Sequence, residues 1–149
     1  MSTSYRPLIR RDLDEILDIE SSSFSVPWIE EEFLRLLRRD DLYKGLVLVS
    51  EGCVLGYMIY ELGKYQAEIL NLAVNPKERN QGFGTQIVQV AKRLLYKQRT
   101  SLIVGVMETN LQGQLFFKNR GFVCTEILRN QYETTDEDTY RMTYSTVKE

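Results

Sequence analysis

The amino-acid sequence predicts a mixed fold of α-helices and β-strands, and two patterns carry this prediction. Two apolar segments, 46–49 and 54–62, flank a Glu51-Gly52 turn, which is typical of an antiparallel hairpin. Apolar segment 67–74 is then followed by a glycine-containing turn and by segment 84–97, in which apolar residues recur at spacings of three and four. The chain therefore passes from strand to turn to amphipathic helix near its middle.

The other elements follow from caps, breakers and short apolar runs. Asp12 is a plausible N-cap, Pro27 suits the first turn of a helix, and Gly121 suits the position just after one. The expected elements are strand 5–10, a helix from Asp12 to about residue 22, a helix from Pro27 to about residue 39, strand 102–107, helix 111–119 and a final strand pair, 122–128 and 139–144.

Length and charge restrict the class of protein. The chain has 149 residues and no repeat or Pro/Gly/Ser-rich linker, so we expect one domain over residues 1–149. Its 19 basic and 21 acidic residues nearly balance, so the chain lacks the excess of positive charge that is typical of proteins that bind nucleic acid or a membrane surface. Its apolar runs are too short to cross a bilayer, and the N-terminus lacks the apolar core of a signal peptide. We therefore expect a cytoplasmic protein.

Cysteine and histidine usage narrows the chemistry. Cys53 and Cys124 lie in strand-like segments without metal-site spacing, so we expect both to be buried, reduced thiols. The chain contains no histidine, which removes a histidine general base, a Ser-His triad and most zinc sites. No metal cofactor is expected.

The segment 71–84 has the features of an anion-binding site. Gly82 and Gly84 allow a ligand to approach the backbone closely, and the first N–H groups of the next helix lack intrahelical partners. The spacing is neither a dinucleotide-binding fingerprint nor a P-loop. A phosphate-containing ligand of another class is therefore predicted at this turn.

The run Arg79-x-x-Gly82-x-Gly84 resembles the signature of the GCN5-related N-acetyltransferases (GNAT), whose loop cradles the pyrophosphate of acetyl-coenzyme A. The resemblance extends over residues 19–142. It is most similar to the bacterial ribosomal-protein-alanine N-acetyltransferases, the RimI-like subfamily, through Ile19-Glu20-x-x-x-Phe24-x-x-Pro27-Trp28-x-Glu30, Glu108-Thr109-Asn110, Asn119-Arg120-Gly121-Phe122, Arg129-Asn130-x-Tyr132 and Glu137-Asp138-x-x-x-Met142.

The resemblance implies a fold and an activity. The fold would be the GNAT α/β fold, a mostly antiparallel seven-stranded sheet with about four helices on its two faces and a parallel, splayed strand pair at the coenzyme. The activity would be acetyl transfer from acetyl-coenzyme A to an amine, by direct attack in a ternary complex. The N-terminal α-amine of a protein, such as a ribosomal protein, is the first candidate acceptor. A small-molecule acceptor and a non-catalytic acyl-coenzyme A binder are the alternatives.

The resemblance also implies the coenzyme contacts. Backbone groups of three strand residues would bind the acetyl and pantetheine arm, the glycine turn would wrap the pyrophosphate, and Asn110 would bind pantetheine. The full set is Leu72, Ala73, Val74, Arg79, Asn80, Gln81, Gly82, Phe83, Gly84, Thr85, Asn110 and Phe117. Plainer interpretations stay open: the strand side chains belong to the core, Arg79 is a surface residue, and Asn110 caps the next helix.

The acceptor side would be formed by two loops. The loop 24–28 would be one wall of the acceptor groove through Phe24 and Trp28, or else a hydrophobic clamp between helices and sheet. The polar loop 129–138, with Tyr132, would overhang the acceptor, or else is simply a solvated loop.

Two positions depart from the resembling subfamily. Gly105 stands where relatives carry a catalytic glutamate, and Phe117 stands where they carry a general-acid tyrosine. This favours an acceptor with a low pKa, since an α-amine has a pKa of about 8 and a lysine of about 10.4. Glu68 or Tyr132 is the preferred replacement base.

Glu20 and Glu108 are further candidates for the base. The plain interpretations are that Glu68 and Glu108 are exposed charges and that Glu20 lies on a helix surface.

Overall fold

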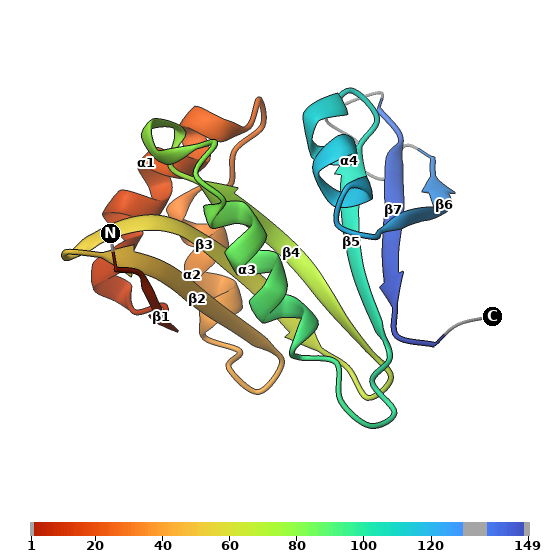
Figure 1. Cartoon of the computed structure of the whole chain (residues 1–149). Coiled ribbons are helices and arrows are strands. Elements are labelled where there is room, and N and C mark those ends of the chain that lie inside the picture. The colour runs from red at the N-terminus through yellow and green to blue at the C-terminus, as the bar shows by residue number, and fades with distance from the viewer. Residues whose placement is uncertain (1, 130–136, 148–149) are drawn as a thin grey trace.

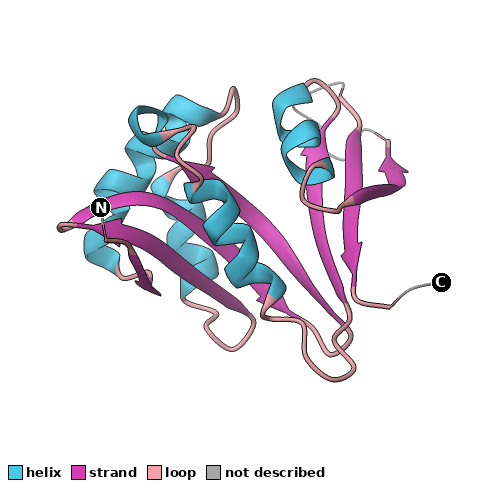
Figure 2. Cartoon of the chain, viewed as in Figure 1, coloured by secondary structure: helices cyan, strands magenta, loops and turns pink. Residues whose placement is uncertain are grey.

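The computed structural model of the chain describes residues 2–129 and 137–147. Its strands form one sheet in the order β1-β2-β3-β4-β5-β7-β6 (Figures 1 and 2). The strands are β1 (Ser4–Pro7), β2 (Tyr43–Ser50), β3 (Cys53–Leu62), β4 (Gln66–Val74), β5 (Ser101–Met107), β6 (Val123–Leu128) and β7 (Thr139–Ser145). The helices are α1 (Leu13–Ser23), α2 (Glu30–Leu37), α3 (Phe83–Lys92) and α4 (Leu111–Lys118), with 3₁₀ turns η1 (Arg10–Asp12) and η2 (Pro76–Glu78).

The helices cover both faces of the sheet, so the core has two halves. On one side, α1 and α2 pack against Tyr57 and Ile59 of β3. On the other side, α3 and α4 pack against Met58, which lies between Tyr57 and Ile59 in the sequence. Successive strand residues point to opposite faces, and both faces are covered, which explains the nearly continuous burial along β3.

All strand pairs are antiparallel except β4 and β5, which run parallel. Their pairing extends from Gln66–Ser101 to Ile69–Val104 and stops there. Beyond that point the two strands diverge, and the sheet opens as a V between α3 and α4 (Figure 1). The expected seven-stranded sheet, its four helices and the splayed parallel pair are confirmed for the described residues.

A β-bulge in β4 lies just after the end of this pairing. The register with β3 passes from Tyr60–Ile69 to Ile59–Asn71, so Leu70 is the extra residue. Leu70 packs against the core half under α1 and α2, and Asn71 bonds to α1. The bulge therefore places two consecutive residues of β4 on the same face.

Several element ends differ from the sequence-based expectation. The second helix begins at Glu30 rather than at Pro27, because the chain is still extended at Ile29. The long helix ends at Lys92 rather than at residue 97, since the chain turns tightly toward β5 there and Lys97 adopts a positive φ of 54°.

Both cysteines are exposed and free, so the prediction that they are buried is wrong. Cys53 is the first residue of β3 after the hairpin turn, and Cys124 lies on the edge strand β6. Every residue of β6 except Leu128 is exposed, because β6 is an edge strand of the sheet. Within the described ranges, no helix is long and apolar enough to cross a membrane.

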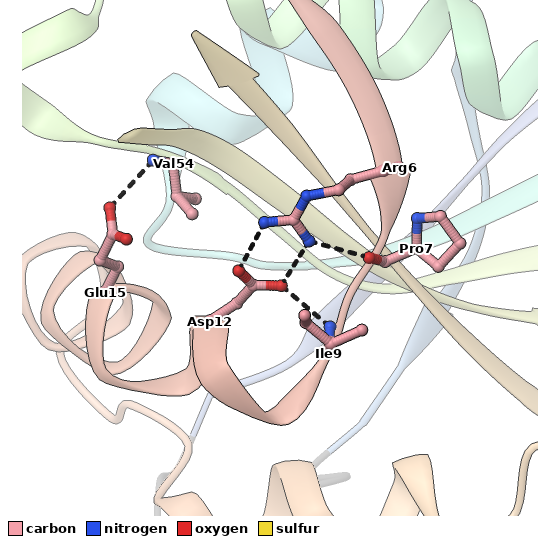
Figure 3. Close-up of polar contacts among 6 residues, drawn as sticks. All are labelled: Arg6, Pro7, Ile9, Asp12, Glu15 and Val54. Atoms are coloured by element: carbon pink, nitrogen blue, oxygen red, sulfur yellow. Dashed lines mark hydrogen bonds and ion pairs between the residues drawn. The ribbon is translucent and has the colours of Figure 1, made fainter. Parts of the chain in front are cut away.

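Asp12 precedes α1 as expected, but its side chain does not cap that helix. Its carboxylate accepts hydrogen bonds from Arg6 Nη1 and Nη2, both at 2.8 Å, and from the Ile9 N–H at 2.9 Å (Figure 3). The Arg6 guanidinium holds the pKa of Asp12 below its usual value, against the opposing effect of burial. This pair fastens the start of α1 to the edge strand β1.

Replacing Asp12 with asparagine should lower the free energy of unfolding at pH 7 by about 2 kcal/mol, because the substitution removes a buried partner of Arg6. The folded-state pKa lies below the unfolded-state value of about 3.9, so the stabilisation is complete above that pH and is lost as the pH falls through the folded-state pKa. Urea unfolding at several pH values measures this.

The exposed pair Arg39–Asp41, with an N–O distance of 3.5 Å, provides the control. Asp41→Asn should change stability by less than about 0.5 kcal/mol. An Asp12→Asn protein as stable as its parent at pH 7 would contradict the assigned role.

Candidate functional site

The N-terminus of α3 has the geometry that anion binding requires. Gly82 is the N-cap and has a φ of +84°, and no atom lies within 4 Å of where its Cβ would be. The first backbone bond of the helix runs from Gln86 N–H to the Gly82 carbonyl. The N–H groups of residues 83–85 therefore have no intrahelical acceptor, and they stand at the positive end of the helix dipole.

The second glycine of the motif has a role that the sequence did not indicate. A Cβ on Gly84 would lie 2.9 Å from the Phe116 ring of α4, so glycine allows α4 to pack closely on α3. Arg120 stacks on the Phe116 ring at 3.8 Å and donates to Thr85 Oγ1 at 2.6 Å. The Arg120 guanidinium is thereby held beside the N-terminus of α3, where it adds positive charge.

The other predicted residues of the loop have more varied surroundings. Arg79 donates to Ser23 Oγ at 2.9 Å and to the Val74 carbonyl at 3.3 Å, so it ties the loop to α1 and β4. Phe83 is buried in the core, so that only its backbone can meet a ligand. Gln81 bonds to Glu78, and Asn80 is exposed with a positive φ of 63°.

Asn110 has the capping role that its plainer interpretation predicts, and its pantetheine-binding role stays a prediction. Its Oδ1 accepts the Gly113 N–H at 2.9 Å and so caps α4. The amide nitrogen remains a potential donor to a ligand. A Cβ on residue 113 would lie 2.6 Å from Asn110 Nδ2, so glycine at this position leaves room for the capping side chain.

The V between β4 and β5 exposes a strand edge on each side. Residues 70–74 and 105–107 lie beyond the last parallel pair, Ile69–Val104. Backbone N–H and C=O groups at such an edge need partners, and an extended chain that contains amides can supply them. Leu72, Ala73 and Val74 are on this edge, next to the α3 N-terminus, while Leu72 and Ala73 also pack their side chains in the two core halves. The V therefore offers two unpaired strand edges to an extended ligand that contains amides.

A cleft of about 330 Å³ lies on the face of the sheet that carries α2. Its lining residues come from α2, from the loop before it and from strands β2 to β7. Trp28 of the α1–α2 loop is one wall and packs on Phe33, with ring centroids 5.2 Å apart. Phe24 packs against the core under α1 and α2. Both side chains thus pack as the hydrophobic clamp, and Trp28 also lines this cleft, whereas the acceptor role of the loop stays a prediction. Tyr132, the other predicted acceptor residue, lies outside the described residues.

Glu68 lies in this cleft together with Gly105, and it is partly buried. Its pKa is raised, first by burial and then by the neighbouring Glu61, while Arg141 acts in the opposite direction. Glu61 and Glu68 are directly opposite each other on β3 and β4, an arrangement that disfavours folding. A carboxylate with a raised pKa beside a strand opening is a good proton acceptor.

Glu20 is buried at 1% exposure, so its interpretation as a helix-surface residue is wrong. Its carboxylate accepts from the Trp28 N–H at 2.8 Å, from Asn71 Nδ2 at 2.7 Å and from the Tyr57 hydroxyl. Burial and the adjacent carboxylate raise the pKa of Tyr57, which keeps this hydroxyl protonated as a donor. Glu20 thereby links α1, the loop between α1 and α2, β3 and the bulge of β4.

Replacing Glu20 with glutamine should destabilise the fold by about 3 kcal/mol, because an amide NH₂ would face donors that now bond to a carboxylate. Thermal unfolding measures this, and Asp18→Asn, on the exposed side of the same helix, is the matched control. Equal melting temperatures for the two variants would show that the network contributes little.

Glu108, the remaining candidate base, is used in the structure as a link between strands. Its Oε1 accepts the Asp138 N–H at 3.1 Å, and its own N–H donates to the Asp138 carbonyl at 3.0 Å. It is half-buried rather than exposed, and this pairing joins the end of β5 to the start of β7.

Comparison with known proteins decides which family has this arrangement. Residues 13–122 match the model of the Acetyltransferase (GNAT) family. The chain belongs to the GNAT acetyltransferase family. As a GNAT enzyme it is an N-acetyltransferase that uses acetyl-coenzyme A.

Individual relatives agree with this membership. A Bacillus subtilis (strain 168) protein provisionally named ribosomal protein bS18-alanine N-acetyltransferase is 30% identical over 128 residues, which is 85% of each chain. The crystal structure of the Escherichia coli ribosomal-protein-S18-alanine N-acetyltransferase superposes with a TM-score of 0.83 at 22% identity, covering 99% of this chain and 96% of that one. The structure of Ard1 from Thermoplasma volcanium gives 0.85 at 22% identity, over 99% and 100%.

The two positions at which the sequence analysis expects a departure from the subfamily, Gly105 and Phe117, occupy different places in this GNAT fold. Gly105 lines the cleft. It lies two residues along β5 from Ile103, which pairs with Glu68 of β4 in the sheet. Phe117 is buried between Phe116 and Phe122, with ring centroids about 5 Å apart (5.0 and 5.1 Å). Its ring therefore belongs to the core, and it has no proton to donate.

Proposed function

We propose that this chain acetylates the N-terminal α-amine of a protein, such as a ribosomal protein, with Glu68 as general base. The observation that carries the proposal is the Glu68 carboxylate, with its raised pKa, in an open cleft beside the divergence of β4 and β5. The names of the relatives support the same class of acceptor.

The coenzyme would bind along the V, with its pyrophosphate at residues 80–85 and its pantetheine arm on the edge of β4. The proposed contacts are the backbone of Leu72, Ala73 and Val74, the loop residues Asn80, Gln81, Gly82, Phe83, Gly84 and Thr85, the side chains of Arg79 and Asn110, and Phe117 as an apolar support. Trp28 and Tyr132 would contact the acceptor, with Phe24 behind Trp28.

In the reaction, the lone pair of the acceptor amine attacks the thioester carbonyl of acetyl-coenzyme A. The new C–N bond forms as the C–S bond breaks, the amine proton passes to the Glu68 carboxylate, and the thiolate takes a proton from water. An acid for the leaving group is not essential, because a thiol of pKa about 8.5 departs as thiolate near neutral pH at small cost. Proximity in the ternary complex supplies much of the rate.

Thiol release from acetyl-coenzyme A tests the proposal. A peptide with a free N-terminal alanine should react about a hundredfold faster than the same peptide with a blocked N-terminus and one internal lysine, because far less of the lysine is neutral at pH 7. Turnover confined to small amines, or a coenzyme-induced melting shift without turnover, would reject the proposal. An acceptor of ribosomal type would place the enzyme in the cytoplasm.

A further inference from the structure

Arg120 is a cation beside the N-terminus of α3 that the proposed coenzyme contacts do not include. It follows α4 in the chain, and its guanidinium stacks on the Phe116 ring, 3.8 Å from the ring centroid. Its Nη1 donates to the Phe116 carbonyl at 2.7 Å, and its Nε and Nη2 donate to Thr85 Oγ1 at 3.0 and 2.6 Å. Contacts on two helices therefore hold this side chain in one orientation.

The charge of Arg120 is not balanced by a nearby acid. Among the residues that the structure describes, no carboxylate forms an ion pair with Arg120. A second cation, Lys92, donates from Nζ to the Arg120 carbonyl at 2.6 Å, and burial followed by the Arg120 charge lowers the pKa of Lys92. Burial also lowers the pKa of Arg120. An anion bound here would stabilise the charged form of both groups.

The contact with Arg120 also decides what the Thr85 hydroxyl can do. Thr85 is the third residue of α3, in the turn whose N–H groups lack intrahelical acceptors. A hydroxyl has two lone pairs and one hydrogen, and two N–H groups of Arg120 occupy the lone pairs. Only the hydrogen remains, and it points away from the guanidinium. The Thr85 hydroxyl is therefore a donor, beside backbone groups that are also donors.

We propose that Arg120 is a coenzyme-positioning residue, which fixes the Thr85 hydroxyl as a donor to a pyrophosphate oxygen and places a positive charge beside that pyrophosphate. This inference rests on the proposed placement of the coenzyme. Three of the five N–H groups of a guanidinium are used within the chain, which leaves two for a phosphate oxygen. Such charge-assisted hydrogen bonds are stronger than neutral ones. No covalent bond changes at either residue.

The packing of α4 prepares this arrangement before the coenzyme binds. Phe116 contacts both partners, because a Cβ on Gly84 would lie 2.9 Å from its ring and the Arg120 guanidinium stacks on it. An arginine that is already ordered loses little side-chain entropy when a ligand binds. A link that only fastened α4 to α3 would stabilise the fold without contributing to coenzyme affinity.

Calorimetric titration of matched variants with coenzyme A tests this inference. We expect the Kd to rise about tenfold in Thr85→Val and about thirtyfold in Arg120→Met. The double variant should also lose about thirtyfold, rather than the product of about three hundred, because the Thr85 hydroxyl depends on Arg120. Lys118→Met, which removes an exposed cation from α4, is the control and should keep the Kd within about twofold.

Acetyl-pantetheine as the acetyl donor separates a phosphate contact from a loosened fold, because it lacks the pyrophosphate. In Arg120→Met we expect kcat/KM to fall about thirtyfold with acetyl-coenzyme A and less than about twofold with acetyl-pantetheine. Thr85→Ser, which retains the hydroxyl, should bind coenzyme A at least about three times more tightly than Thr85→Val.

The outcomes separate this inference from the proposed function. Wild-type affinity for coenzyme A in Arg120→Met or Thr85→Val overturns the inference alone. Equal losses with the two donors also overturn it, since the link between α3 and α4 would then be structural. Full multiplication of the two single losses in the double variant overturns the coupling of Arg120 to Thr85.

Two further results concern the proposed function. Normal coenzyme A binding by wild type without thiol release from any peptide overturns the proposed acceptor chemistry, while the calorimetric titrations still decide the role of Arg120. An affinity for coenzyme A that Gly82→Trp does not reduce overturns the proposed coenzyme placement and this inference together.

Discussion

Replacing Gly82 with tryptophan is expected to abolish coenzyme binding and, with it, thiol release. Gly82 is the N-cap of α3 and has open space beside it, so an indole at this position would cover the N–H groups of the first helical turn. For wild type, coenzyme A at a hundred times its Kd should raise the melting temperature by roughly 5 to 10 °C. The variant should show no such rise in a thermal-shift measurement.

Gly52→Trp is the matched control for this experiment. Gly52 also has a positive φ, of +80°, and open space at its Cβ, but it lies in the turn between β2 and β3. Both substitutions force an L-residue into the left-handed region, at about 1 to 2 kcal/mol. Gly52→Trp should therefore lose similar stability and keep the coenzyme-induced shift. A normal shift in Gly82→Trp would place the phosphate site elsewhere.

Replacing Glu68 with glutamine is expected to lower kcat/KM for the peptide acceptor about a hundredfold, the usual range for loss of a general base. The coenzyme-induced melting shift should remain, because Glu68 lies on the cleft side of the sheet and away from α3. Steady-state kinetics together with thermal shift measure the two properties separately. Full activity in Glu68→Gln would exclude this residue as the base.

The pH dependence gives a second and independent check on Glu68. Activity requires the ionised carboxylate, so it should rise with pH through the pKa of Glu68, which lies above the usual value of about 4.3. That limb should disappear in Glu68→Gln, while the limb near pH 8, which belongs to the α-amine, stays. Glu61→Gln removes a like charge and should move the Glu68 limb to lower pH.

The strand, turn and helix at which coenzyme binding is proposed were largely predictable from the sequence because they are local. A strand, a turn with a glycine and a helix succeed one another within residues 67–92, and backbone geometry alone orients the free N–H groups. What escaped prediction there depends on α4, which is distant in sequence. Gly84 is small because Phe116 packs on it, and Thr85 is held by Arg120.

The surroundings of the proposed acceptor site were far less predictable. Glu20 looked like a surface residue because charged residues on helices are mostly exposed, and its burial follows from donors on three other segments. Its partner Asn71 is 51 residues away and is turned toward it by a bulge that no periodicity reveals. The signal available in the sequence was the Ile19-Glu20 pair within the family-like segment.

The sequence by itself determined the order of helices and strands and the glycine turn before α3, because each depends on neighbouring residues. Motifs spread over residues 19–142 indicated the coenzyme-binding family. Only the tertiary structure decided that Glu68, Gly105 and Thr139 share one cleft. They come from three strands that are adjacent only in the order β4-β5-β7, and that order is set by how the two core halves pack rather than by any local pattern.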